Sequence, residues 1–421
     1  MKRLRELIRL MGPGLLYAGA AVGVSHLVQS TRAGADFGFA LIWAILLANA
    51  MKYPFFQFAP RYTASTGKNL IEGYRILGRW AVVMFLIITV LTMFAIMAAI
   101  TIVTSGLIIH IFGISLNSTF VSGLLLAFTT SMLILGRYSI LDRIIKWVIL
   151  LLTVSTIVAL VAAIGHGFSP QESFAKSFDI SYFPHLAFLI ALFGWMPAPL
   201  DISVWQSLWA KAKHEEQGVN LNKKQALLDF NIGYIGTALL AIGFLSLGAF
   251  VMYGNPEEMS SNGAVFAGQL ISMYTVNLGG WSYIFIATAA LMTMVSTSFT
   301  CHDAYARVMS ITVGQVFDEG KKSKISPKVQ YIIWLVVLLL GTVFVLGYLA
   351  DNMRLMVDFA TILSFIIAPA FGILNYKLIT HQHVPKADQP SRFLRIYAIV
   401  GIVLLTGFSL YYIYFRLITL L

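Results

Sequence analysis

The sequence predicts an all-α membrane protein with about eleven transmembrane helices, of which the first and the sixth are discontinuous. Three observations carry this prediction: the composition, the number of long apolar segments, and the helix-breaking residues inside two of those segments. Of the 421 residues, 58% are hydrophobic and 11% are charged, whereas about 25% of the residues of a soluble domain are charged. The composition therefore excludes a soluble globular protein.

The apolar segments are long enough to cross a bilayer, since a helical span needs about 20 residues. One of them, 82–111, is longer than a single span needs, and we expect it to tilt or to project from the bilayer. The first segment follows basic residues as in a signal peptide, but further spans follow it, so we interpret it as a retained helix. The candidate spans are 12–32, 39–58, 82–111, 116–135, 147–165, 184–207, 226–253, 281–304, 329–349, 353–376 and 396–415.

The basic residues predict the orientation of these spans, because Lys and Arg collect in cytoplasmic loops. With alternating loops, 24 of the 29 basic residues fall on the side of the N-terminus. The other side has Arg32, Lys176, Arg354 and Arg416, and Lys52 lies within a span. We therefore expect a cytoplasmic N-terminus, an outside C-terminus and, from the short loops, a prokaryotic inner membrane. The net charge of +11 then reflects loops that face anionic lipid, and no nucleic-acid partner is implied.

The sixth span is interrupted by the stretch "FGWMPAPLDISVWQSLW" (193–209), which holds Pro197, Pro199 and Asp201. Proline lacks a backbone N–H and clashes with the preceding turn. The carbonyls that it frees need partners inside protein or beside water. The stretch therefore predicts either a simple kink or, as we favour, a discontinuous helix with an acid beside the break.

The first span carries a similar interruption in "GAAVGVSHLVQSTRAG" (19–34), where Gly and Ala surround Val24, Ser25 and His26. Paired interruptions at corresponding positions of two halves are typical of inverted-repeat secondary transporters. We expect one transmembrane domain over residues 1–421. It would consist of five-helix repeats at 12–165 and 184–376 and an additional span at 396–415. Half-helix ends would then create a polar site in the middle of the membrane.

The stretch "FGFALIWAILLANAMKYPFFQFAPRYTASTGKNLIEGYR" (37–75) resembles the second span and following loop of the Nramp divalent-metal transporters. The preceding "GPGLLYAGA", the pair Met196–Pro197, the acid Asp229 near the start of span 7 and the number of spans are also similar. The resemblance implies a LeuT-like fold with discontinuous spans 1 and 6. It also implies transport of a divalent metal cation of the Mn, Fe or Mg class, which typical members import with protons.

The resemblance assigns a metal site to the two breaks, with departures from the family pattern. Span 1 of the family carries D-P-G-N, and here Gly23 replaces the Asp and His26 replaces the Asn. Span 6 keeps the methionine of M-P-H as Met196 but has Ala198 in place of the histidine. His26 and Met196 are the expected side-chain ligands. Alternatively, His26 carries a proton or hydrogen-bonds a neighbouring helix, and Met196 is a flexible packing residue. The full set of expected contacts is Gly23, Val24, Ser25, His26, Phe193, Met196 and Ala198.

Other departures bear on the coupling and on the charge of the site. Span 3 has no carboxylate, which argues against proton coupling, and Ala360 lies near the position of the span 10 glutamine of the family. Hard divalent ions prefer several oxygen ligands that include carboxylates. Thioether and imidazole bind softer ions as part of a larger ligand set. The predicted site is therefore neutral, with few ligands.

Ionisable residues within spans are candidates for function, because their burial in a membrane is costly. Lys52 either extends toward the interface or provides a fixed positive charge where a bound cation would lie. Asp201 lies either near the site or in a vestibule pair. Asp229 is a further candidate for coupling or for the vestibule. Asp358 is expected to pair with Arg354 at i−4.

The eighth candidate span, 281–304, ends in "STSFTCHDAYAR" (296–307), which is rich in small hydroxyl residues. We interpret it mainly as helix packing and cavity lining. Asp303 and Asp229 are expected near the inner helix ends, either solvated or paired with neighbours such as Arg307. The single cysteine, Cys301, excludes an internal disulfide.

The leading functional hypothesis is a secondary transporter of divalent metal cations. One alternative keeps the fold but transports an anion or a small organic solute, which Lys52 and exposed half-helix N-termini would suit. Another is a non-transporting membrane sensor. An enzyme is not expected, because HExxH and GxSxG motifs are absent from the sequence. No cofactor is expected, the partners are the transported species and the lipid bilayer, and the oligomeric state stays open.

Overall fold

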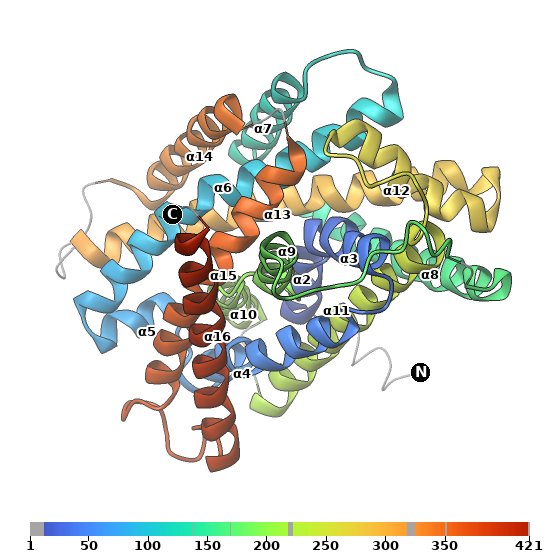
Figure 1. The fold of residues 1–421 in the computed structure, drawn as a ribbon. Coiled ribbons are helices and arrows are strands. Elements are labelled where there is room, and N and C mark those ends of the chain that lie inside the picture. The colour runs from blue at the N-terminus through green and yellow to red at the C-terminus, as the bar shows by residue number, and fades with distance from the viewer. Residues whose placement is uncertain are drawn as a thin grey trace, which may run out of the picture.

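The computed structural model describes residues 12–136, 138–168, 170–217, 222–317, 325–349 and 352–419. Within these ranges every regular element is a helix and there is no strand (Figure 1). The prediction of an all-α protein is confirmed. Its long apolar segments form helices because their backbone groups must be satisfied internally in lipid.

Span 1 is discontinuous, as the sequence predicts. Helix α2 (Pro13–Ala21) ends where Val22 adopts an extended conformation. After Gly23 the chain resumes helical structure, with a π-helix at Ser25–Ser30 that continues as α3 (Thr31–Phe37). The break thus lies at the small residues expected to interrupt the span. The Val22 N–H before it still bonds the Ala18 carbonyl at 2.8 Å, and the Gly23 carbonyl after it accepts from Leu27 at 2.9 Å.

Span 6 is discontinuous as well. Helix α9 (Phe183–Trp195) and helix α10 (Ile202–Gln217) are separated by the non-helical residues 196–201. Pro197 and Pro199 lie in this segment, where neither can donate a backbone hydrogen bond. The simple-kink alternative is therefore wrong.

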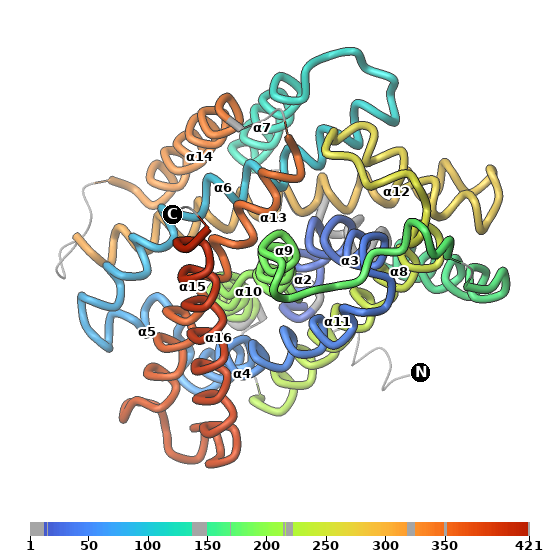
Figure 2. Tube along the Cα trace, viewed as in Figure 1, coloured from blue at the N-terminus to red at the C-terminus, as the bar shows by residue number. Residues whose placement is uncertain are grey.

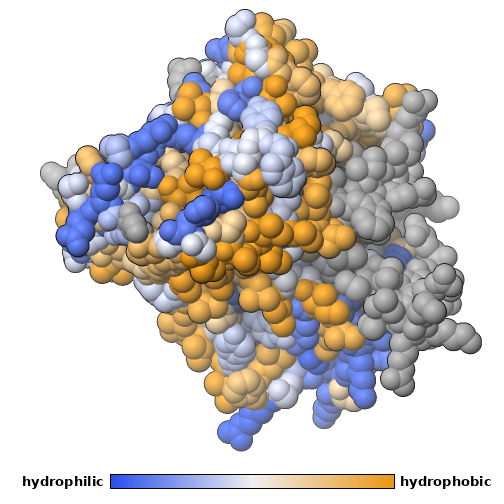
Figure 3. Space-filling view, turned by 90° about the vertical axis from the view of Figure 1, so that its right-hand side faces the viewer, coloured by the Kyte–Doolittle hydropathy of each residue, from blue (hydrophilic) through white to orange (hydrophobic). Residues whose placement is uncertain are grey.

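The remaining long helices surround these two broken spans. Six of the described helices are long and apolar enough to cross a membrane: α6, α11, α13 (preceded by Gly280–Ser282), α14, α15 and α16. On the face in Figure 3, hydrophobic residues cover most of the described surface, while hydrophilic residues gather toward the left and lower edges. The bounds are α4 (Ile42–Thr66), α6 (Arg79–Phe112), α7 (Ser118–Ile134), α8 (Tyr138–His166), α11 (Lys223–Met252), α13 (Tyr283–Phe317), α14 (Pro327–Leu349), α15 (Met353–Ile379) and α16 (Arg392–Ile418).

Two shorter helices lie outside the predicted spans. Helix α5 (Leu70–Leu77) begins at Asn69, whose side chain forms a reciprocal capping box with Glu72. Helix α12 (Gly263–Leu278) begins at Asn262, whose side chain accepts two backbone hydrogen bonds. Neither was expected, because both helices are shorter than the about 20 residues of a membrane span.

The broken spans run in opposite directions through the centre of the molecule (Figures 1 and 2). Helix α2 contacts α10, and the start of α2 at Gly12 lies against Lys213 near the end of α10. At the other side, Phe37 at the end of α3 packs on His185 and Phe188 of α9. We call these the α2–α10 side and the α3–α9 side.

Glycines allow the broken spans to pack closely on neighbouring helices. A Cβ atom on Gly14 of α2 would lie 2.2 Å from a backbone oxygen of α11, and one on Gly34 of α3 would lie 1.8 Å from another. A Cβ on Gly194 of α9 would lie 1.9 Å from the carbonyl oxygen of Thr361 in α15. Small residues of this kind let membrane helices approach each other closely. Span 1 is therefore packed against α11, and α9 is packed against α15.

Helix α16 satisfies carbonyls that prolines leave open in two other helices. Pro54 in α4 cannot bond the carbonyl of Ala50 one turn earlier, and the Tyr397 hydroxyl donates to that oxygen at 2.7 Å. Pro369 in α15 likewise frees the carbonyl four residues earlier, that of Phe365, and the Ser409 hydroxyl donates to it at 3.4 Å. The helix outside the two predicted repeats thus supports the backbone of both.

Candidate functional site

Lys52 of α4 lies at the break of span 6, and its side chain is completely buried. Its Nζ donates to the carbonyl oxygen of Gly194 at 2.6 Å and to that of Ala198 at 3.0 Å. Gly194 belongs to the last turn of α9, where carbonyls have no partner within the helix. The expectation that Lys52 extends toward the interface is wrong, because α4 passes the break and places the ammonium group on these carbonyls.

Asp201 lies at the other end of the same break and is 3% exposed. Its Oδ2 accepts a hydrogen bond of 2.7 Å from the hydroxyl of Tyr305 in α13. Its Oδ1 is buried and has no hydrogen-bond partner among the described residues. Asp201 interacts electrostatically with Lys52, but no ion pair joins the two described side chains. Asp201 thus lies at the break of span 6, and its role at a site or in a vestibule stays a prediction.

His26 lies just after the break of span 1 and faces α11. Its Nε2 is 2.9 Å from the carbonyl oxygen of Thr237. Its Nδ1 is 2.7 Å from the Ser25 hydroxyl and 3.1 Å from the carbonyl oxygen of Ala21. Both ring nitrogens therefore have protein partners, and a metal ion could bind His26 only in place of one of them. A role for His26 as a metal ligand stays a prediction.

Met196 begins the break of span 6, and its sulfur lies 3.9 Å from the hydroxyl of Ser30 in the π-helix of span 1. The break of span 6 therefore lies against the π-helix that follows the break of span 1. Met196 and His26 contact different groups, and the described residues contain no cluster of three His, Cys, Asp or Glu that could hold a metal. The expected contacts Gly23, Val24, Ser25, His26, Phe193, Met196 and Ala198 are all buried along these two segments.

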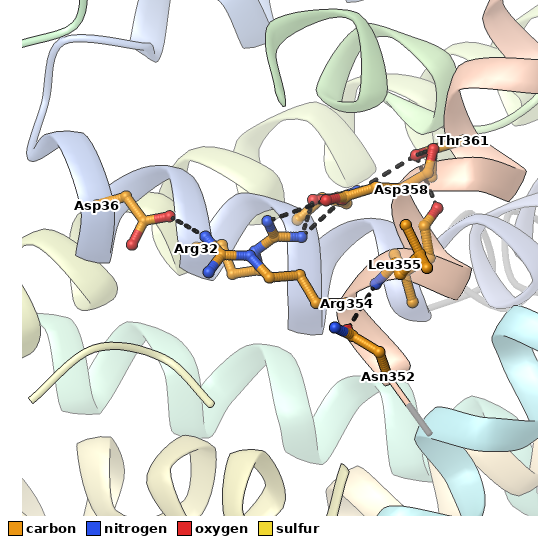
Figure 4. Close-up of polar contacts among 9 residues, drawn as sticks. Arg32, Asp36, Asn352, Arg354, Leu355, Asp358 and Thr361 are labelled. Atoms are coloured by element: carbon orange, nitrogen blue, oxygen red, sulfur yellow. Dashed lines mark hydrogen bonds and ion pairs between the residues drawn. The ribbon is translucent and has the colours of Figure 1, made fainter. Parts of the chain in front are cut away.

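A network of charged residues joins α3 to α15 on the α3–α9 side (Figure 4). Arg32 is 2% exposed, and its Nη1 is 2.7 Å from the Oδ1 of Asp358. Its guanidinium also lies 4.9 Å from the ring centroid of Phe188 in α9. Arg354 pairs with Asp36 at 3.1 Å. Arg32 thus connects α3, α9 and α15 on the α3–α9 side of the two breaks.

This network corrects two expectations. Asp358 does not pair with Arg354 at i−4, because the acids and arginines of α3 and α15 exchange partners across the interface between the two helices. Arg32 does not lie in a loop but within α3, where it is buried. Gln29, one turn earlier in span 1, adds a hydrogen bond of 3.1 Å to Asp358.

Asp229 and Asp303 have different partners near the ends of their helices. Asp229 of α11 accepts backbone hydrogen bonds from Gly14 at 2.7 Å and from Gly12 at 3.3 Å, at the N-terminus of α2. The partial positive charge at the N-terminus of a helix stabilises a carboxylate at this position. Asp303 pairs with Arg307 at 2.7 Å. The expected pairing with a basic neighbour is therefore confirmed for Asp303, while Asp229 binds the N-terminus of α2 and interacts electrostatically with Lys213 of α10.

The polar residues at 296–307 contact neighbouring helices. The Ser298 hydroxyl is 3.1 Å from that of Thr104 in α6. The His302 Nδ1 is 3.1 Å from the Thr129 hydroxyl of α7, and its Nε2 is 3.1 Å from the carbonyl oxygen of Leu335. These contacts agree with the interpretation of the segment as helix packing.

Sequence reasoning did not identify Arg32, Thr237 and Tyr305 as parts of the site. Arg32 could have been found, because it follows an apolar run within a span and ionisable residues there are candidates for function. Thr237 participates through its backbone oxygen, which no side-chain motif reports. Tyr305 lies 104 residues from Asp201 in the chain, so only the fold brings the two together.

The chain matches one protein family over nearly its whole length. The family model described as natural resistance-associated macrophage protein-like, Nramp, matches residues 14–415. Protein PM0681 of Pasteurella multocida (strain Pm70) is 33% identical over 411 residues, which cover 96% of this chain and 91% of that protein. The divalent metal cation transporter MntH of Yersinia pestis is 34% identical over 68 residues, which cover 16% of this chain and 17% of MntH.

Solved structures of transporters are similar in fold. A mutant of the Eremococcus coleocola manganese transporter matches with a TM-score of 0.72 and 13% identity, over 97% of this chain and 86% of that one. MhsT in complex with L-phenylalanine matches with a TM-score of 0.61 and 15% identity, over 96% of this chain and 97% of that one. The prediction of a LeuT-like fold with discontinuous spans 1 and 6 is confirmed, and the extent of the family match shows that this chain belongs to the Nramp family.

Proposed function

We propose that this protein is a secondary membrane transporter that carries a divalent metal cation of the Mn, Fe or Mg class between its two broken helices. The observation that carries the proposal is the contact between the break of span 6 and the π-helix that follows the break of span 1, where Met196 meets Ser30. Open backbone groups at such breaks coordinate substrates and ions in transporters of this architecture. Membership of the Nramp family supports a metal as the cargo.

In this proposal Met196 provides a soft ligand, and His26 provides a second one after it releases a protein partner. Backbone oxygens near Gly23 and Phe193 complete the inner ligand set. Asp201 provides the negative charge that span 1 lacks, because its Oδ1 is buried and has no partner among the described residues. A +2 ion needs such a charge, since hard divalent cations prefer carboxylate oxygens.

The proposed transport path runs from the α3–α9 side, which we place outside, to the α2–α10 side, which we place in the cytoplasm. This assignment rests on the excess of Lys and Arg in the loops of the α2–α10 side. The N-terminus is then cytoplasmic, the C-terminus is outside, and the membrane is a prokaryotic inner membrane. The Arg32–Asp358 pair lies at the outer entrance, so transport requires that pair to separate. We assign no enzymatic activity and no cofactor to this chain.

Lys52 favours a second candidate, the transport of an anion or a small organic solute through the same site. Its ammonium group is bonded to two carbonyl oxygens at the break. A divalent cation cannot share those oxygens with it, because like charges repel strongly in a medium of low dielectric. An anionic or hydrogen-bond-accepting solute would instead be attracted.

Metal binding is tested by calorimetric titration of the purified protein in detergent with Mn²⁺, Mg²⁺ and Cd²⁺. The metal proposal predicts saturable binding that Met196→Ala and His26→Ala each weaken by about tenfold or more, a loss of about 1.4 kcal/mol. Met132→Ala, in α7 away from the breaks, is the matched control and leaves the affinity unchanged. Absence of binding heat with every ion, in a folded and monodisperse sample, overturns the metal proposal.

Lys52→Met separates the two candidates, because it removes the charge but keeps most of the side-chain volume. If a metal is transported, loss of the ammonium charge raises the affinity for Mn²⁺. If an anion or an organic solute is transported, the same change lowers its uptake into proteoliposomes and creates no metal affinity.

A further inference from the structure

The break of span 6 leaves backbone carbonyl oxygens without helical partners, and such oxygens attract a cation. The last carbonyls of a helix have no partner within it, and the C-terminal end of a helix carries a partial negative charge. In α9 the oxygen of Gly194 lies at this end, and that of Ala198 follows within the break. In broken-helix transporters such carbonyls coordinate a dissolved cation.

Here these carbonyls are bonded to a side chain. Lys52 comes from α4, which belongs to neither broken span, and its ammonium group contacts both oxygens while it is fully buried. A charge buried in this way is costly unless it is hydrogen-bonded or paired. The carbonyls provide the hydrogen bonds, and Asp201 provides an opposite charge nearby without a direct ion pair. The ammonium group thus satisfies the carbonyl oxygens, and the oxygens and Asp201 in turn stabilise its charge.

We propose that Lys52 is a tethered cation that occupies the place of a dissolved monovalent cation at the break of span 6. The conformational cycle then proceeds without the binding of Na⁺, K⁺ or Li⁺ at that place. The idea of a cycle rests on the proposed transport function. The binding of Lys52 to the carbonyls does not depend on that function, so the proposed function and this proposal can fail separately.

The test compares the thermal unfolding of four proteins in detergent: the wild type, Lys52→Ala, Lys52→Ser and Lys224→Ala. Each is measured in NaCl, KCl, LiCl or choline chloride at equal ionic strength, with no transported substrate. Choline is the reference cation because it is too large to replace an ammonium group between two carbonyls. Lys224, at the exposed start of α11, controls for the loss of one lysine charge.

The proposal predicts that the Tm of the wild type and of Lys224→Ala is the same in all four salts. Lys52→Ala and Lys52→Ser should lose stability in choline chloride. They should regain at least about 3 °C in a saturable manner with one of the small cations, which is on the order of 1 kcal/mol. If a variant is too unstable to purify in choline chloride, recovery of folded protein in one of the other salts counts as the same gain.

Two outcomes would overturn the proposal. One is a saturable stabilisation of the wild type by Na⁺, K⁺ or Li⁺ that is lost in both Lys52 variants. The other is the absence of any gain from small cations in both variants, including their failure to fold in every salt. Failure of metal binding in the calorimetric titration leaves this result untouched, because no substrate is present.

Discussion

Arg32 of α3 and Asp358 of α15 form an ion pair of 2.7 Å in which the arginine side chain is 3% exposed and the aspartate side chain is 26% exposed. The pair therefore lies at the edge of the buried interior, with the arginine on the inner side. It joins span 1 directly to span 10, and Arg32 reaches span 6 through the ring of Phe188. Separation of α3 from α15 requires this pair to break.

Asp358→Asn should favour the state that is open on the α3–α9 side, because it leaves the buried Arg32 without its charged partner. The measurement is the labelling rate of a thiol introduced by Ser30→Cys in a Cys301→Ser background. We expect a rise of about tenfold, equivalent to about 1.4 kcal/mol. Asp36→Asn removes the more exposed neighbouring pair and should change the rate less. Equal rates in the Asp358→Asn variant and its parent would contradict the closing role of the pair.

The carbonyls that prolines leave open in α4 and α15 predict that two substitutions in α16 destabilise the protein. Tyr397→Phe removes the donor to Ala50, and Ser409→Ala removes the donor to Phe365. Each should lower the free energy of unfolding by about 1 kcal/mol, as for other hydrogen bonds between membrane helices. Unfolding in mixed micelles with increasing SDS measures the change.

Tyr411→Phe is the control for the loss of a tyrosine hydroxyl. It lies on the same helix and contacts Phe415 through its ring. If Tyr411→Phe costs as much as Tyr397→Phe, the carbonyl interpretation is wrong.

Close packing predicts that Gly194→Ala is severely destabilising. Its Cβ would lie 1.9 Å from the Thr361 carbonyl oxygen, which is backbone and cannot move aside alone. Overpacking typically costs about 1–3 kcal/mol and occasionally more, and the altered α9 would also displace the carbonyl that binds Lys52. Gly236→Ala in α11 meets no atom within 4 Å and should be neutral or gain up to about 1 kcal/mol. Similar folded yields for both variants would show that α9 can shift along α15.

The loop between α15 and α16 should become less stable in mild acid. His383 bonds Tyr62 at 3.0 Å and His381 at 2.6 Å. Burial, and then the positive charges of His381 and Lys68, hold the pKa of His383 below its usual value. Below about pH 6.5 the unfolded loop therefore binds protons before the folded loop does. Stability is lost as the pH falls from there toward the lower folded-state pKa.

Hydrogen exchange of residues 380–391 at pH 7.5 and 5.5, corrected for the intrinsic rate, measures this loss. The wild type should lose protection at the lower pH, whereas His383→Gln should show the same protection at both. An acid-induced loss that persists in His383→Gln would assign the effect to another group.

The breaks of spans 1 and 6 could be predicted from the sequence because their causes are local. Proline removes a donor wherever it occurs, and the Gly-rich run around Gly23 weakens a helix without reference to its neighbours. The positions of Met196 and Ala198 at the second break follow from the same residues.

The partners of the charged residues could not be predicted in this way. The i−4 rule that paired Asp358 with Arg354 describes an isolated helix, and in the folded protein an arginine of span 1 is available to the same carboxylate. The direction of the Lys52 side chain could not be predicted for a similar reason. Its sequence neighbours allow either orientation, and only the passage of α4 beside the break decides between them.

The glycine contacts have a consequence for how the molecule can move. Both halves of span 1 are held against α11, at Gly14 and Gly34, while α9 of span 6 is held against α15, at Gly194. The two walls of the central site therefore pack on two different helices, and we call these closely packed groups the α11 unit and the α15 unit. A shift between the α11 unit and the α15 unit would widen or narrow the space between the breaks without bending either wall, and Arg32–Asp358 is a contact that measures the separation of those units.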